Sequence, residues 1–181
     1  MSHLSANEVN EFFGIWLPLL GYVNKKAKLY PELDTMTVEK GMVPQIAGKI
    51  AEKLWADVSL IDGYLAENNR LTEGEKDLLR SWKRAKTDNF IYERQLREGA
   101  VFINQAREVY IVKGTSLSFN VMLGGRPLPL ALTATLLPFR DAVITDGIIG
   151  LMDISYGENM KRGFREIYND AVKGNRLIRQ L

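Results

Sequence analysis

The chain has 181 residues, of which 24 are Lys or Arg, 22 are Asp or Glu, one is His and none is Cys. Domains usually hold about 100–200 residues, so we expect one domain spanning 1–181. The lack of Cys excludes disulfides, thiolate zinc sites, iron–sulfur clusters and cysteine nucleophiles. The one histidine, His3, lies at the terminus, where chains tend to fray, so catalysis by a core histidine is also excluded.

No stretch of the sequence has the pattern of a membrane span or an export signal. The longest nearly uncharged run, 12–24, is shorter than the roughly 20 apolar residues that cross a bilayer. Glu8 and Glu11 precede this run, whereas a secretory signal carries positive charge there. We therefore expect a cytoplasmic protein with no membrane partner.

Two capping boxes mark helix starts in the first half. Ser5 and Glu8 have the required spacing, and so do Thr72 and Glu75. Between them, apolar residues recur every three or four positions over 43–68, which predicts one helix.

An aromatic stripe that includes Phe12 and Trp16 predicts an apolar helix face, either buried in the core or docked on a partner chain. Pro18 is expected to kink or divide this helix. Residues 24–42 are typical of a connection, and 1–86 is expected to form a helical region.

The second half, 87–181, changes to the pattern of an antiparallel sheet. We expect Asp146 and Gly147 to form a turn between two strands, because this dipeptide is typical of hairpins. From Glu158 an amphipathic stripe predicts a closing helix that covers one sheet face. The predicted class is α+β: a helical region, a small antiparallel sheet of about five strands and a C-terminal helix packed on it. The candidate strand segments are 90–96, 100–103, 109–112, 130–137, 142–145 and 148–156, with a turn expected at 139–141 and the last two segments as arms of one hairpin.

The motifs LLPF at 136–139, ITDGII at 144–149 and ISYG at 154–157 precede the basic closing helix. From about Leu54 to Leu181 the chain resembles a set of uncharacterised bacterial proteins with this hairpin and a Trp-Lys pair, here Trp82-Lys83. The resemblance implies a hairpin at 136–157, carries over no functional residue and leaves the function open.

Three aspartates near predicted strand ends form a candidate metal site. Asp141, Asp146 and Asp153 would offer the hard oxygen ligands that Mg²⁺ or Mn²⁺ prefers. Such a site would support a divalent-metal-dependent phosphoester hydrolase. The alternative is that Asp141 and Asp146 are turn residues, since Asp bonds its own backbone in tight turns.

Basic residues form a second candidate site, for nucleic acid or another anion. A phosphate chain would be attracted to such a surface, and the start of the last helix offers unpaired backbone N–H groups. The alternative is that these charges are solvated helix faces. The candidate residues are Arg80, Lys83, Arg84, Gly157, Lys161, Arg162 and Arg165.

No catalytic residue and no cofactor is assigned from the sequence. We expect a non-catalytic module that binds a protein partner or a second copy of itself. The metal-dependent hydrolase and a nucleic-acid-binding protein are the alternatives.

Overall fold

The computed structural model describes residues 1–31, 33 and 44–181, and most of the predicted connection at 24–42 lies outside them. The α+β class is confirmed, with helices, a mostly antiparallel sheet and a C-terminal helix packed on it. Contacts divide the chain into a helical unit, residues 6–84, and a barrel unit, residues 1–5 and 85–181. Within the described residues, no helix has the length and apolarity that a membrane span requires.

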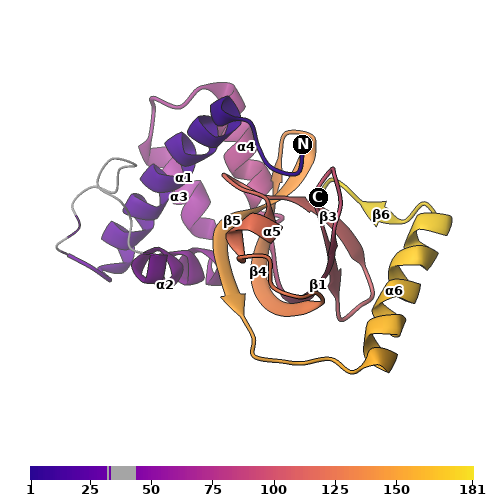
Figure 1. The fold of residues 1–181 in the computed structure, drawn as a ribbon. Helices are drawn as coiled ribbons and strands as arrows, with labels where there is room; N and C mark the ends of the chain where they lie inside the picture. Colours follow the sequence, from indigo (N-terminus) through magenta and orange to yellow (C-terminus); the bar gives the residue numbers. More distant parts are fainter. Residues whose placement is uncertain (32, 34–43) are drawn as a thin grey trace. The chain divides into compact units, whose positions relative to one another are not determined.

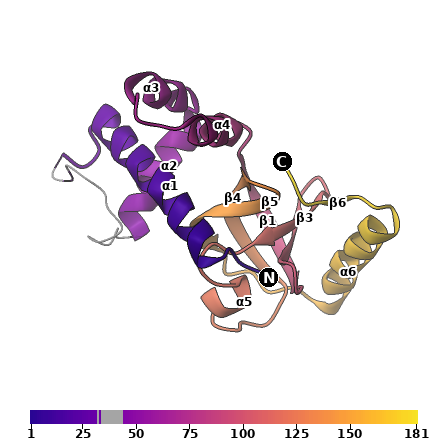
Figure 2. The same ribbon diagram turned by 90° about the horizontal axis from the view of Figure 1, so that it is seen from above.

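Figures 1 and 2 show the helices of the helical unit, and aromatic side chains form its core. The ring of Trp16 stacks on that of Trp55 at 5.5 Å and meets that of Trp82 edge-on at 5.8 Å. Phe12 is fully buried and lies 5.8 Å from Trp82. The aromatic stripe is therefore core. The helices of this unit are α1 (Ala6–Ala27), α2 (Pro44–Ala56), α3 (Ser59–Glu67) and α4 (Glu73–Trp82).

The structure corrects one helix prediction and narrows another. The single helix expected at 43–68 is broken after α2, where the carboxylate of Asp57 accepts hydrogen bonds from the amide and hydroxyl of Ser59. An aspartate that bonds local backbone competes with the helix, which explains the break. Pro18 lies inside α1 and does not divide it, and its neighbours Leu17 and Leu19 are buried in the core.

The strands of the barrel unit close into a ring (Figure 1). Hydrogen-bonded neighbours follow the order β2-β1-β4-β5-β3-β6, and β2 also pairs with β3. The β3–β5 pair is parallel, and the other pairs of the ring are antiparallel. The elements are β1 (Lys86–Gln95), β2 (Ala100–Asn104), β3 (Val109–Lys113), α5 (Phe119–Met122), β4 (Leu130–Phe139), β5 (Ala142–Leu151), α6 (Glu158–Lys173) and β6 (Leu177–Ile178).

Both faces of β2 and β3 are apolar, because the two faces of these strands contribute to two different cores. Phe102 and Tyr110 point into the ring, where they pack with Phe90. The alternate residues, Ile103 and Ile111 among them, point outward and pack against one face of α6. Strands buried on both faces lack polar alternation, which explains the continuous apolar runs at 100–103 and 109–112.

The predicted turn at Asp146 and Gly147 is wrong. The turn predicted at 139–141 is confirmed: the chain reverses at Arg140, whose φ is +52°, and β5 then runs on through 142–151. Asp146 and Gly147 form a bulge within β5, where the pairing with β4 shifts register. Gly147 has a φ of +86°, and left-handed glycine serves bulges as well as turns, so the dipeptide alone does not separate them.

The N-terminus does not fray but pairs with the barrel unit. The amide of Leu4 donates to the carbonyl of Gly114 at 3.0 Å, and the amide of Gly114 donates to the carbonyl of Ser2 at 2.9 Å. His3 therefore forms a short parallel bridge with Gly114.

Candidate functional site

The three aspartates of the predicted metal site have different surroundings. Asp141 is exposed in the turn between β4 and β5, and Asp153 is exposed in the extended segment after β5. Asp146 is buried, and its carboxylate accepts a hydrogen bond from the amide of Ile148 at 3.0 Å, as a structural Asp in a bulge does. Over the described ranges, no group of three or more His, Cys, Asp or Glu side chains is placed to hold a metal ion.

The predicted basic site is divided between the two units. Arg80, Lys83 and Arg84 belong to the helical unit, whereas Lys161, Arg162 and Arg165 belong to α6 of the barrel unit. Arg80 pairs with Asp77 at 2.7 Å and Lys83 with Asp62 at 2.8 Å. Lys161 pairs with Glu158 at 2.8 Å, and Arg162 donates to the side chain of Asn159 at 3.1 Å.

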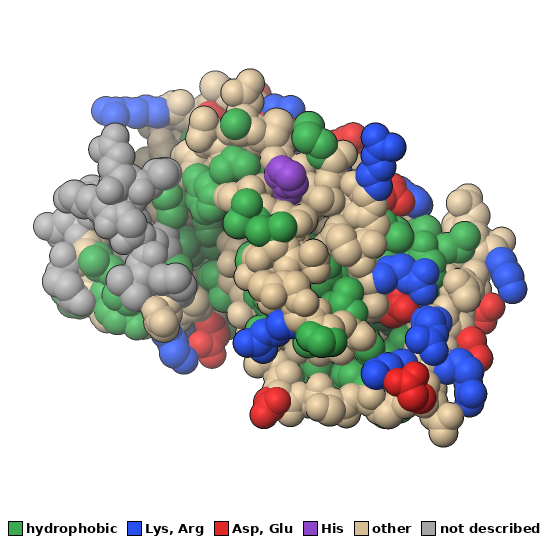
Figure 3. Space-filling view, in the orientation of Figure 1, with side chains coloured by type: hydrophobic (Ala, Val, Ile, Leu, Met, Phe, Trp, Pro, Cys, Tyr) green, Lys and Arg blue, Asp and Glu red, His purple; other side chains and the backbone are tan. Residues whose placement is uncertain are grey.

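The sequence of α6 thus contains both cations and anions, and Figure 3 shows both signs of charge around this helix. Exposed pairs of this kind contribute little free energy and leave little net field. Gly157 is the N-cap of α6 and makes no side-chain capping bond. These residues therefore fit a solvated helix face better than a phosphate-binding surface.

An apolar pocket that the sequence analysis missed lies between the ring of strands and α6. It has a volume of about 540 Å³. Ile91 of β1 and Ile103 of β2 form one wall, and Phe164 and Ile167 of α6 form the opposite wall. The extended segment 152–156 closes one side. The volume is within the range of small-molecule sites, about 300–1,000 Å³.

Large apolar side chains at the pocket remain in contact with water. Met160 is 53% exposed and Ile154 is 47% exposed. Tyr156 packs edge-on against Phe164 at 5.1 Å, and burial raises the pKa of its hydroxyl above the ordinary value. Tyr156 is therefore protonated at neutral pH and is a poor base.

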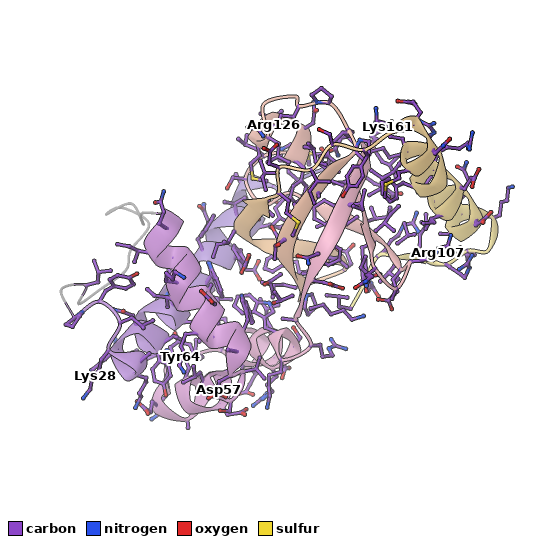
Figure 4. All side chains as sticks on the ribbon, turned by 90° about the horizontal axis from the view of Figure 1, so that it is seen from below. Lys28, Asp57, Tyr64, Arg107, Arg126 and Lys161 are labelled. Carbon is purple, nitrogen blue, oxygen red and sulfur yellow. The ribbon has the colours of Figure 1, made fainter. Side chains whose placement is uncertain are left out.

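The turn between β2 and β3 gives the pocket its polar end. Asn104, Gln105 and Arg107 line it there, and Arg107 has a φ of +62° at the tip of the turn. The side-chain amide of Asn104 donates to the carboxylate of Glu108 at 2.9 Å. Figure 4 labels Arg107 together with Arg126 and Lys161.

A second, more polar pocket lies on the other side of segment 152–156. Its volume is about 450 Å³, and it is lined by the loop before β4 and by the start of α6. Arg126 and Lys161 supply positive charge to it, and Asp153 supplies a carboxylate. Of the predicted site residues, Asp153 and Lys161 are therefore brought to one pocket.

A polar cluster stands beside the turn that carries Arg107. The hydroxyl of Tyr110 donates to Glu108 at 2.5 Å, and the ammonium of Lys86 donates to that hydroxyl at 3.0 Å. The bond from Tyr110 and then that from Asn104 lower the pKa of Glu108. The bond to Tyr110 is the main cause that raises the pKa of Lys86. Burial, followed by the bond to Glu108, raises the pKa of Tyr110.

No family model, curated protein or solved structure matches the chain significantly. The resemblance based on the LLPF, ITDGII and ISYG motifs stays a prediction. Function therefore has to be argued from the pocket and the fold.

Proposed function

We propose that the chain is a non-catalytic binding module and that the apolar pocket of its barrel unit is the binding site. The observation that carries the proposal is the exposure of Met160 and Ile154 at the wall of a concave apolar pocket. When a ligand or partner covers exposed apolar side chains in a pocket, apolar surface is removed from water, which favours binding.

The chemistry of the lining supports binding rather than catalysis. Arg107 and Tyr156 are the ionisable side chains among the described residues of this pocket. An arginine is never deprotonated in proteins, and the raised pKa of Tyr156 keeps its proton in place. Neither group is suited to general acid–base work near neutral pH.

The test uses a neutral apolar dye, Nile red, and two matched methionine variants of the full chain. Met160→Glu places a charge on the pocket wall, whereas Met122→Glu places one on α5, outside the pocket, at a residue 40% exposed. We expect Met160→Glu to weaken dye binding by roughly tenfold or more, since covering a methionine contributes about 1.5–3 kcal/mol. Met122→Glu should bind as the parent does. Equal binding by both variants would remove the pocket as the site.

A second candidate, single-stranded nucleic-acid binding, is favoured by the strand order. The ring β1-β2-β3-β5-β4, with β3 parallel to β5 and a helix between β3 and β4, has the order of the oligonucleotide- and oligosaccharide-binding barrel. Such barrels bind ligands over the face of their second and third strands. Here Ile103 and Ile111 of that face pack against α6, which weakens this candidate.

The nucleic-acid candidate is tested by fluorescence anisotropy with a labelled 15-nucleotide oligothymidylate. Binding that weakens steeply between about 50 and 200 mM salt would support it, because phosphate contacts release counterions. Absence of binding at the lower salt concentration rejects it.

A further inference from the structure

The walls of the apolar pocket are mostly aliphatic, with the rings of Tyr156 and Phe164 packed edge-on against each other, and one end of the pocket is charged. Ile91, Ile103, Ile154 and Met160 represent the walls. Among the described lining residues, Arg107 is the one that carries a charge. The two rings already pack on each other, and the most exposed apolar side chains at the pocket, Met160 and Ile154, are aliphatic, which suits a flexible hydrocarbon chain.

The charge of Arg107 is available to a ligand. Its side chain is exposed and forms no hydrogen bond or ion pair with any residue in the described part of the chain. The adjacent carboxylate of Glu108 is already engaged by Tyr110 at 2.5 Å and by Asn104 at 2.9 Å. The guanidinium of Arg107 is therefore unpaired at the end of the pocket, because the neighbouring carboxylate of Glu108 is hydrogen-bonded to other residues.

The amide side chain of Gln105 lies in the same turn and lines the same end. It makes no side-chain hydrogen bond to another described residue. An amide and a guanidinium are both hydrogen-bond donors, and donors to an anion form the stronger, charge-assisted bonds. The polar end is thus complementary to an anionic head group.

We propose that the occupant of this pocket is a single aliphatic chain with an anionic end, of the fatty carboxylate class. The aliphatic chain of the ligand lies between the outer face of β1 and β2 and the side chains of α6, and its head group contacts Arg107. The inference rests on the proposed function, because it takes this pocket to be the binding site. A membrane surface is a different occupant, since it would need an extended face rather than a pocket with one polar end.

The experiment measures affinities of the full chain for hexanoate, octanoate, decanoate and neutral 1-octanol, each below its micelle concentration, by calorimetry. Each added methylene should tighten carboxylate binding by about fourfold, which is 0.8 kcal/mol converted to an affinity ratio. Octanoate should bind roughly two- to tenfold more tightly than 1-octanol, as expected of a partly exposed charge-assisted contact.

Arg107→Gln keeps the length of the side chain and removes its charge. The matched control is Arg97→Gln, since Arg97 is exposed in the turn between β1 and β2 and does not line the pocket. We expect Arg107→Gln to abolish the preference for octanoate over 1-octanol without changing 1-octanol binding. Arg97→Gln should keep the preference. Circular dichroism melting of both variants verifies that they fold.

The outcomes separate this inference from the proposed function. Equal affinity for octanoate and 1-octanol overturns the anionic head group and leaves the pocket as a binding site. Binding of Nile red that depends on Met160, without binding of any carboxylate, overturns the aliphatic occupant alone. Binding to anionic lipid vesicles without binding of monomeric carboxylates also overturns it. If neither the dye nor the carboxylates bind, both proposals are rejected.

Discussion

The guanidinium carbon of Arg94 lies 4.2 Å from the centre of the Tyr168 ring and so joins β1 to α6. Arg94 follows the point at which the pairing of β1 with β2 shifts register, and it also pairs with the buried carboxylate of Glu93. The bulge turns the arginine outward onto the helix. This contact helps to hold the C-terminal half of α6 on the barrel, beyond the apolar pocket.

Replacing Tyr168 should therefore loosen α6. We expect Tyr168→Ala to lower the free energy of unfolding by about 1–3 kcal/mol, since it removes a half-buried ring and a cation–π contact. Tyr168→Phe keeps the ring and should stay within about 0.5 kcal/mol of the parent. Urea denaturation measures both, and hydrogen exchange should show faster exchange of α6 amides in the alanine variant. Equal stability of the two variants would contradict a role for the ring.

Much of this architecture follows from sequence patterns. The stripe through Phe164 and Ile167 predicts a closing helix on one sheet face, and these residues do pack there. The apolar runs at 100–103 and 109–112 predict strands, because the β-branched and aromatic residues in them suit a pleated surface. The position of the pocket is not predictable in this way, because it depends on how far the start of α6 stands from the sheet. The spacing of apolar residues along the helix does not determine the distance between the start of α6 and the sheet.

Gly114 and Gly163 are expected to respond in opposite directions to alanine. A Cβ at Gly114 would lie 1.8 Å from the backbone carbonyl oxygen of Leu117, so the loop after β3 and its bond to Leu4 would have to move. We expect a loss of about 3 kcal/mol or more, typical of severe overpacking.

Gly163 lies inside α6 with open space around its Cβ position. Gly163→Ala should stabilise the barrel unit by about 0.5–1 kcal/mol, because alanine loses less backbone entropy in a helix. Thermal unfolding of both variants measures the difference. A stabilising Gly114→Ala would show that the close approach to Leu117 is wrong.

The capping box of α4 predicts a measurable effect in the helical unit. The hydroxyl of Thr72 accepts from the amide of Glu75, and the carboxylate of Glu75 accepts from the amide of Thr72 at 2.7 Å. Thr72→Ala should cost about 1 kcal/mol, and Thr72→Ser should cost much less because it keeps the acceptor. Chemical denaturation followed by tryptophan fluorescence suits this test, because Trp82 lies at the end of the same helix. An alanine variant as stable as the serine variant would contradict the capping role.

The lowered pKa of Glu108 predicts how the stability of the barrel unit depends on pH. The bond from Tyr110, the bond from Asn104 and the charge of Lys86 lower its pKa in the folded chain. A carboxyl group whose pKa is lower when folded contributes stability that is present above its unfolded pKa. That contribution is lost as the pH falls from the ordinary glutamate range, about 4.3, through the lower folded value.

Glu108→Gln removes this titration but leaves an acceptor for the hydroxyl of Tyr110. The parent should therefore be more stable than the variant at pH 7, and the gap should narrow as the pH falls below about 4. The measurement is a series of urea denaturation curves between pH 7 and pH 3. A gap that stays constant over this range would mean that packing around Glu108, rather than its charge, holds the end of the barrel beside Arg107 together.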